Sequence, residues 1–434
     1  MTTGLDPLHT SPARSSILVD EAGPPRKKLA RRAASIGRVA VGHGFRAVRT
    51  RDRLDLIRSA AEELGPSWVK VGQLVAASPG SFPPALADAL RTLHDDVAPQ
   101  PFDVISKILL EDLGRDYWRL DIDPRPVAAG SVAQVHRAVL DGEHDVAVKV
   151  QRAGILDTID ADLRLLRSGA RAAIRVRPRL NALRLVEAID DLRLGLAEEL
   201  DFRREASNMV ELTPVMAGWD IRVPSIHPGL CTERVVVMDW VDAVAVHDRE
   251  TIAAFGADPE DVMRRVLGSL LESALVHGRF HADGHGGNVL VDRDGRVVIV
   301  DFGIVGSTDP ADRPAIADML AGVFSERFDR LALSITRLPS FAHASAEAGA
   351  ALADVAQRHI TGDLSTIKMG VLLREILEMA MEQGIPLPAE LVLLFKQILY
   401  FDGLARALTP NFDLFADGRR YLPMLEEVAA GAVS

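Results

Sequence analysis

The chain contains the sequence HADGHGGN at residues 281–288 and the sequence VIVDFG at residues 298–303. The first fits the pattern H-x-D-x-x-x-x-N of a phosphoryl-transfer loop, and the second ends in the D-F-G signature. This chemistry needs a carboxylate beside the nucleophile, an amide oxygen that holds a metal, and a second carboxylate on the metals that bridge the phosphates. We therefore predict that Asp283 is the catalytic aspartate and that Asn288 and Asp301 are metal ligands.

Residues 289–300, between the two motifs, have the sequence VLVDRDGRVVIV. Two β-branched runs around an Asp-Gly pair predict a β-hairpin. Such a hairpin would return Asp301 towards Asp283 and Asn288. Either motif alone is a weak signal, whereas both motifs in this order, with a hairpin between them, indicate a kinase-like centre.

A strand-like run, VAVK at residues 146–149, matches the V-A-I-K pattern whose lysine contacts the α- and β-phosphates. A lysine on a strand is usually a solvated edge residue, but Lys149 lies between alternating valines and precedes the catalytic motif in the expected order. The run from Val132 to Leu140, the pair Asp141-Gly142 and the run from Val146 to Gln151 predict a second β-hairpin, which includes Lys149. The loop before this second hairpin takes the place of a glycine-rich phosphate loop, although it has one glycine and two alanines. The residues of this loop are Ala128, Ala129, Gly130 and Ser131.

Lys149 needs a carboxylate partner that holds its ammonium group in place. The sequence EELDFRREA at residues 198–206 offers Glu198, Asp201 and Glu205 at helical spacings, so we expect these three to share one helix face. Charged helix faces are most often only solvated, so charge pattern alone leaves the choice of partner open.

The composition is that of an ordinary globular protein, with 434 residues, 48% hydrophobic and 26% charged. A single cysteine, Cys231, excludes an internal disulfide and favours a reducing compartment. The apolar segment 385–399 is interrupted by Glu390 and Lys396 and is too short for a membrane span, so we predict a buried helix there. With no pattern typical of a signal peptide, we expect a cytoplasmic protein.

Positive charge is concentrated in residues 26–58, which hold eleven basic and two acidic residues in a chain of net charge −11. This arm is either a solvated segment, or a surface that docks on an anionic membrane or an acidic partner. Nucleic-acid binding is disfavoured because Phe45 is the only aromatic residue in the segment.

Four segments resemble the UbiB/ADCK (AarF-type) family of atypical kinases. They match its K-x-G-Q motif, its alanine-rich loop, its E-x-D motif and a stretch near its C-terminus, and the resemblance covers residues 60–415. In chain order they are GPSWVKVGQL at 65–74, AAGSVAQVH at 128–136, ELDFRREA at 199–206 and LPAELVLLFK at 387–396.

The resemblance implies a role for each matching residue of the motifs. Lys149 looks like the nucleotide lysine, with Glu205 as its ion-pair partner. Lys70 looks like the K-x-G-Q lysine, which would reach into the site near Glu199 and Asp201. The adenine-binding hinge would fall at Met238, Asp239 and Val241.

The resemblance also implies the cofactors and the reaction. We expect ATP or ADP with Mg²⁺, and phosphoryl transfer to water, a small molecule or a lipid in isoprenoid-quinone or other lipid metabolism. A Ser/Thr protein kinase and a catalytically weak nucleotide-binding scaffold remain as alternatives. Gly284 and Gly286 stand where the family often has larger residues, which predicts a looser catalytic loop.

The expected fold is α+β, a helix-rich protein-kinase-like fold with two lobes. We expect a disordered basic tail at 1–34 and a helical K-x-G-Q extension at 35–125. The N-lobe would occupy 126–245, with a helical E-x-D insert at about 155–212, and the helical C-lobe would occupy 246–434.

Overall fold

We describe a computed structural model of the chain, which divides into two compact units. Unit 1 comprises Met1–Ser207 and Ser225–Trp240, and unit 2 comprises Asn208–Pro224 and Val241–Ser434. The residues that the structure describes are 26–47, 53–77, 89–90, 97–178, 184–325, 327, 330, 333–334, 337–338, 389–409, 412 and 414–431.

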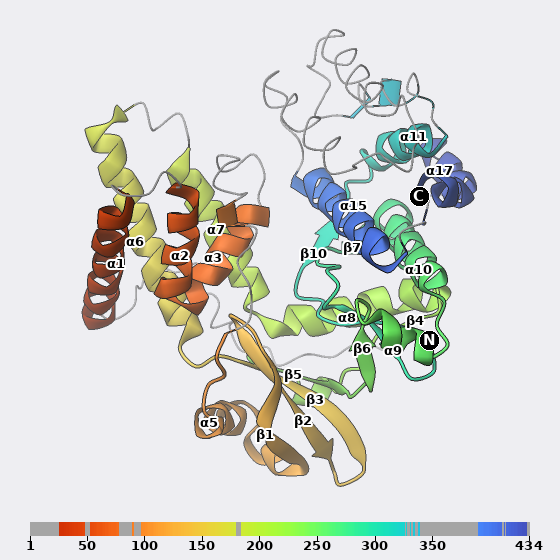
Figure 1. Ribbon diagram of the computed structural model, residues 1–434. Helices are drawn as coiled ribbons and strands as arrows, with labels where there is room; N and C mark the ends of the chain where they lie inside the picture. The colour runs from red at the N-terminus through yellow and green to blue at the C-terminus, as the bar shows by residue number, and fades with distance from the viewer. Residues whose placement is uncertain are drawn as a thin grey trace. The chain divides into compact units, whose positions relative to one another are not determined.

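Unit 1 contains a four-stranded antiparallel sheet in the order β1-β2-β3-β5 (Figure 1). Its strands are β1 Leu120–Ala129, β2 Ala133–Leu140, β3 His144–Gln151 and β5 Val235–Asp239. The β2–β3 turn has positive φ angles at Asp141 (53°) and Gly142 (76°), as an Asp-Gly hairpin turn requires. The hairpin predicted over these residues is therefore confirmed.

Helix α5 (Phe102–Leu113) packs on this sheet. Its buried residues Ile105 and Leu109 recur at helical spacing and contact the same core as Val146 and Val148 of β3. Full burial of each such side chain stabilises the fold by about 1.5–3 kcal/mol. The last helix of the expected helical extension, 35–125, thus packs in the core of the sheet. Strand β1 also begins inside this expected extension, at Leu120. The 3-10 turn η2 (Gly114–Arg119) joins α5 to β1.

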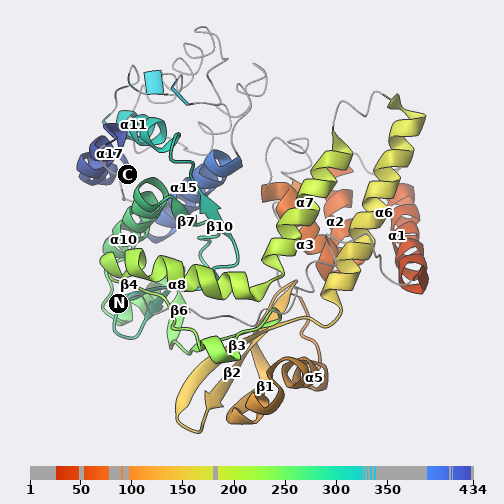
Figure 2. The ribbon, with the colours of Figure 1, turned by 180° about the vertical axis from the view of Figure 1, so that it is seen from behind.

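A separate cluster of helices in unit 1 combines two helices that precede β1 in the chain with two helices that lie between β3 and β5 (Figure 2). Its core includes Val69, Leu163 and Leu196, from three different helices. The predicted extension and the predicted insert therefore share one hydrophobic core. The helices of the cluster are α2 Arg53–Leu64, α3 Pro66–Ala77, α6 Ile155–Val176 and α7 Leu185–Glu199.

Helix α1 (Arg26–Ala47) begins inside the segment that was expected to be disordered, so that expectation is wrong for residues 26–34. Arg32 donates from Nε (2.5 Å) and from a terminal nitrogen (2.8 Å) to the two oxygens of the fully buried Asp162 on α6. Lys28 pairs with Asp157 of the same helix at 2.9 Å. These long-range pairs hold residues that look like a solvated basic tail when only their local composition is considered.

Unit 2 is helix-rich, and its small sheets carry the catalytic motifs. One sheet has the order β4-β9-β8-β6, and β7 pairs with β10. The hairpin predicted at 289–300 is confirmed, because β8 and β9 pair antiparallel. The strands are β4 Ile221–Arg222, β6 Ala243–Ala245, β7 Arg279–His281, β8 Val289–Asp292, β9 Val297–Ile299 and β10 Val305–Ser307.

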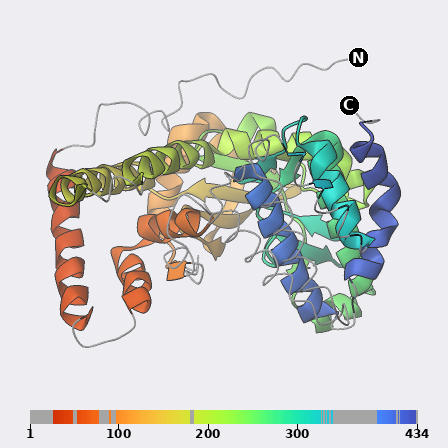
Figure 3. The ribbon, with the colours of Figure 1, turned by 90° about the horizontal axis from the view of Figure 1, so that it is seen from above.

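Helices of unit 2 pack around these strands, and α11 and α17 lie side by side (Figures 1 and 3). Helix α15 has buried apolar residues, as predicted for 385–399, although residues 385–388 lie outside the described part. In the described residues, no helix has the length and apolarity that a membrane span requires. Helix α8 (Phe202–Gly218) begins in unit 1 and ends in unit 2. The other helices are α9 Arg249–Ala254, α10 Pro259–Glu272, α11 Arg313–Phe324, α15 Ala389–Leu408, α16 Leu414–Gly418 and α17 Leu422–Ala429.

Candidate functional site

Unit 1 brings the strand lysine and one carboxylate together. Lys149 on β3 has its Nζ 2.7 Å from Oε1 of Glu205, and their side chains are only 11% and 3% exposed. The ammonium also lies 5.5 Å from the centre of the Phe202 ring. A carboxylate at this distance favours the charged form of a lysine in a largely buried place.

The expectation that Glu198, Asp201 and Glu205 share one helix face is wrong. Helix α7 ends at Glu199 and α8 begins at Phe202, so the helix is broken between these carboxylates. Asp201 lies directly before α8, and its side chain accepts a hydrogen bond from the backbone N–H of Arg203 at 3.2 Å. An aspartate at this position satisfies an N–H at the helix start and favours a new helix there.

Lys70 forms an ion pair with Glu199, and both side chains are largely buried. Asp201 is instead held by Arg203, whose Nε and one terminal nitrogen each donate to it at 2.8 Å. The hydrogen bond to Asp201 raises the pKa of Arg203. The structure therefore joins Lys70 to one of the two expected carboxylates, and the other has an arginine partner of its own.

The alanine-rich loop is held by main-chain contacts. Ala128 and Ala129 end β1, Ser131 is buried, and the N–H of Gly130 donates to the carbonyl of Ala133 at 2.8 Å. Arg152 donates from Nε to the Gly130 carbonyl at 2.7 Å. The same arginine also donates to the carbonyls of two residues in the segment before α5, Val97 and Ala98.

Arg152 has no motif pattern that the sequence analysis used. Its position directly after β3 is the only sequence signal that could have found it. Burial of this guanidinium is tolerated because its N–H groups donate to backbone carbonyls around the loop.

The expected hinge residues lie at the end of β5. Met238 is buried, and Asp239 is 3.1 Å from Nε2 of His227. The backbone N–H of Asp239 also donates to the carbonyl of Ser225 at 2.9 Å. Val241 is the first residue of unit 2 in this part of the chain, so the expected hinge coincides with the division between the units.

In unit 2, the β8–β9 hairpin brings the two ends of the catalytic sequence together. The N–H of Val300, just after β9, donates to the carbonyl of Asn288, just before β8, at 3.0 Å. The side-chain nitrogen of Asn288 donates to the carbonyl of Asp283 at 2.9 Å. This bond orients the amide so that its oxygen is the atom with which Asn288 can bind a metal.

Asp301 has a left-handed backbone conformation, with φ of 59°. This conformation is uncommon for residues other than glycine, although aspartate tolerates it better than most. Nε2 of His281 donates to the Asp301 carbonyl at 2.9 Å, and Gly303 N–H donates to the Asp301 carboxylate at 3.3 Å. Burial lowers the pKa of His281, and the carbonyl acceptor requires a proton on Nε2.

Asn208 of α8 supports the residue after Asp301. Its side-chain nitrogen donates to the carbonyl of Phe302 at 3.0 Å, while its oxygen accepts from Arg279 at 3.0 Å. The ring of Phe302 packs edge-on against His281, at 4.8 Å between the ring centres. The sequence analysis missed Asn208, because a single asparagine in a helix has no local pattern.

The predicted metal ligands have the chemistry that Mg²⁺ prefers, since Asn288 and Asp301 both offer hard oxygen atoms. Among the described residues, no three His, Cys, Asp or Glu side chains form a metal-binding group. A magnesium ion carried by a nucleotide keeps several waters and takes only one or two protein carboxylates besides phosphate oxygens. The donor set therefore fits the expected cofactor.

Known proteins with similar sequences come from bacteria and plants. An uncharacterized protein of Mycobacterium tuberculosis is 35% identical over 82% of this chain and 74% of its own length. A chloroplastic aarF domain-containing protein kinase of Arabidopsis thaliana is 30% identical over 84% and 73%, respectively. The "Probable protein kinase UbiB" of Vibrio atlanticus is 32% identical over 87% and 72%.

A solved complex of a Mycobacterium tuberculosis protein with erythromycin aligns with a TM-score of 0.43 and 20% identity, over 71% of this chain and 80% of that one. Residues 92–334 match the model of the ABC1 atypical kinase-like domain, and residues 352–413 match the UbiB helical domain. The first match covers more than half of the chain and includes the strand lysine, its glutamate partner and the catalytic loop. The chain belongs to the ABC1/UbiB family of atypical kinase-like proteins and has the kinase-like α+β fold of that family.

Proposed function

We propose that this protein binds ATP or ADP with Mg²⁺ and transfers a phosphoryl group from ATP to water, a small molecule or a lipid. The observation that carries the proposal is the arrangement in unit 2, where one hairpin aligns Asn288 with the residue before Asp301. The buried Lys149–Glu205 pair of unit 1 supports it.

Each residue has a role that follows from its chemistry. Lys149 neutralises charge on the α- and β-phosphates, and Glu205 keeps its ammonium oriented. Asn288 and Asp301 would hold Mg²⁺, which neutralises negative charge between the β- and γ-phosphates. Asp283 accepts the proton of the attacking water or hydroxyl group. A bond then forms between that oxygen and the γ-phosphorus, and the bond from the γ-phosphorus to the β-γ bridging oxygen breaks and releases ADP.

The segment after the D-F-G motif favours a small acceptor over a peptide. Gly303 is followed by the short strand β10, and helix α11 already begins at Arg313. Protein kinases have an activation segment with an A-P-E motif in this place. Residues 304–312 contain no such motif and offer little platform for a peptide. The resemblance to UbiB proteins directs the choice of acceptor to isoprenoid-quinone precursors or other lipids.

Two other functions are alternatives to transfer to water, a small molecule or a lipid. A Ser/Thr protein kinase is favoured by the names of the Vibrio and Arabidopsis relatives, which are called protein kinases. A nucleotide-binding scaffold with negligible turnover is the second alternative, because the loop at Ala128–Ser131 has alanines where close approach of a phosphate is easiest with glycine.

Phosphate release with and without a quinone precursor or anionic liposomes, beside labelling of a peptide array, separates the three functions. The variant Asp283→Asn is the control in both assays. We expect release of phosphate that depends on Asp283 and is stimulated by the lipid or quinone precursor. Strong peptide labelling that depends on Asp283 would indicate a protein kinase, and nucleotide binding without either activity would indicate a scaffold.

A further inference from the structure

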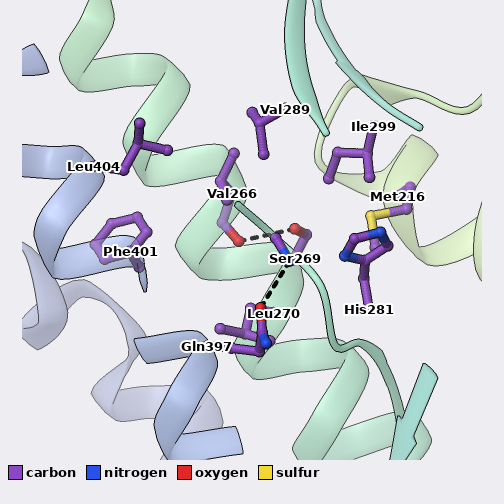
Figure 4. Close-up of a pocket in the computed structure, with 11 residues that line it drawn as sticks. Met216, Val266, Ser269, Leu270, His281, Val289, Ile299, Gln397, Phe401 and Leu404 are labelled. Carbon is purple, nitrogen blue, oxygen red and sulfur yellow. Dashed lines mark hydrogen bonds between the residues drawn. The ribbon is translucent and has the colours of Figure 1, made fainter. Parts of the chain in front are cut away.

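A glutamine of α15 contacts the main chain on both sides of the catalytic aspartate. Gln397 Oε1 accepts a hydrogen bond from the N–H of Gly284 at 2.8 Å. Its Nε2 donates to the carbonyl of Ala282. The bond to the loop is the dashed line at Gln397 in Figure 4. Because Asp283 lies between these two residues, one planar amide holds both adjoining parts of the backbone.

The side chain of Gln397 makes these hydrogen bonds in a buried, mostly apolar environment. Gln397 is only 3% exposed and borders a small cavity whose lining is mostly apolar (Figure 4). In a place of low polarity a hydrogen bond is strong, and an unpaired amide is costly. Leucine, valine, isoleucine, methionine and phenylalanine side chains make up the apolar lining, among them Phe401 and Leu404 of the same helix as Gln397.

Gly284 is part of the same contact. A β-carbon placed on Gly284 would lie 3.2 Å from Oε1 of Gln397, which is tighter than an ordinary contact. The glycine therefore lets the amide approach the backbone closely. The expectation that Gly284 makes the loop looser does not hold at this residue, since its N–H is bound by a buried side chain.

We infer that Gln397 is a positioning residue that fixes the backbone on both sides of Asp283 and so sets the direction of its carboxylate. The inference rests on the proposed function for its effect on turnover. Gln397 lies within residues 352–413, which match the UbiB helical domain, whereas Asp283 lies in the ABC1 kinase-like domain. The helical domain thereby controls the geometry of the catalytic loop through one side chain.

Gln397 should affect turnover without affecting nucleotide binding. The residues assigned to the nucleotide and its metal are Lys149, Asn288 and Asp301, whereas the two hydrogen bonds of Gln397 go to the residues on either side of Asp283. A catalytic group displaced by about 1 Å can cost on the order of 100-fold in rate. Loss of the amide should therefore lower kcat and leave the affinity for Mg-ATP almost unchanged.

Two substitutions test the amide. Gln397→Met keeps the size of the side chain and removes both hydrogen bonds. Gln397→Glu keeps an acceptor for Gly284 and places a second oxygen against the carbonyl of Ala282, unless the carboxyl group is protonated. The matched control is Phe401→Leu, which alters the same helix and the same cavity without touching the amide.

Hydrogen exchange of a peptide covering residues 279–290 is measured together with phosphate release and Mg-ATP affinity. For Gln397→Met we expect exchange of the loop amides to rise about tenfold. We also expect kcat to fall between about tenfold and 100-fold, with affinity within about twofold of wild type. Gln397→Glu should be impaired at neutral pH and recover part of its turnover relative to wild type as the pH falls, because a protonated carboxyl group can donate to Ala282.

Wild-type loop exchange in Gln397→Met, or equal damage in Phe401→Leu, would overturn the inference. If Gln397→Met does not fold, Gln397→Glu and its pH dependence decide the question, and a flat pH dependence counts against the inference. A wild-type protein without phosphate release would remove the proposed function only. The exchange measurement would still show whether Gln397 holds the loop.

Discussion

The candidate site residues of the two units are held in different ways. In unit 1 the candidate lysines are held by charge, in the largely buried pairs Lys149–Glu205 and Lys70–Glu199. In unit 2 the candidate carboxylates Asp283 and Asp301 are held through the backbone at and beside them, by the side chains of His281, Asn208 and Gln397. The chemistry required of each group explains the difference.

A lysine that binds phosphate must stay charged, and a nearby carboxylate stabilises the charged form while it orients the side chain. A carboxylate that binds a metal or accepts a proton must keep its own oxygens available. Bonds to the main chain at and beside Asp283 and Asp301 position the two residues through their backbone. Ionic support therefore suits unit 1, and backbone support suits unit 2.

The largest expected effect is that of Asp301→Asn, which removes the charge and keeps the backbone support. We expect Mg²⁺-dependent nucleotide binding to be lost, because an amide holds magnesium against phosphate much more weakly than a carboxylate. The fold should survive, since asparagine also tolerates the left-handed conformation at this position. Thermal-shift titration with ATP and Mg²⁺ measures the effect, with Asp294→Asn in the β8–β9 turn as control. An unchanged ATP-induced shift would show that Asp301 is not the metal ligand.

Breaking the charge pair of unit 1 should also be costly. Lys149→Met leaves Glu205 without its lysine in a buried place, a change that destabilises by roughly 3–5 kcal/mol. Replacing both partners, in Lys149→Met with Glu205→Leu, should restore most of the stability but not nucleotide binding. If the double variant is as unstable as the single one, support by charge is not the reason that the pair matters.

Alkylation of Cys231 measures how these substitutions in the Lys149–Glu205 pair affect the folding of unit 1. This cysteine belongs to the same buried cluster as Phe202 of α8, and burial raises the pKa of its thiol to about 11. The thiol is therefore protonated at pH 8 and should react slowly with an alkylating reagent while unit 1 is folded. Alkylation should accelerate in Lys149→Met and return towards the wild-type rate in the double variant.

Breaking the second charge pair, Lys70–Glu199, should have a smaller effect, which concerns nucleotide selectivity or turnover. A further lysine near phosphates would repel Lys149 unless a carboxylate neutralises it, and Glu199 does so for Lys70. Lys70→Ala should change the preference between ATP and ADP, or the turnover, by about tenfold, the scale of one hydrogen bond to a charged group. Lys70→Arg is the conservative control. Wild-type affinity, turnover and product profile in Lys70→Ala would contradict a role at the nucleotide.

The smallest effect per residue concerns the exposed charges of α1. Lys28 and Arg32 are engaged with α6, so removal of the whole arm would also disturb the helix cluster. The exposed residues Lys27, Arg31 and Arg38 are the better targets. If α1 docks on an anionic membrane, changing these three to Gln should weaken liposome co-sedimentation by about 1 kcal/mol per residue at low salt. Equal and salt-insensitive sedimentation of both proteins would remove this helix from any membrane contact.

Local patterns predicted the parts of the site whose residues are close in the chain. The Asp-Gly hairpin between Asn288 and Asp301 was predicted correctly, because turn chemistry and strand alternation act over a few residues. The same reasoning failed at residues 198–205, where a charged run continues across a break between two helices. Helical spacing carries no information about where a helix ends.

The sequence by itself determined the family, the kinase-like fold, both hairpins and the identity of the strand lysine and catalytic loop. The family resemblance named Glu205 as the partner of Lys149, and the structure confirms this pair. Only the tertiary structure showed that Arg203 takes Asp201 and that Gln397 supports the loop. Lys149 and Glu205 are 56 residues apart, and Gly284 and Gln397 are 113 apart. Partners at such separations are chosen by how helices pack against strands, and no local pattern of residue types records that packing.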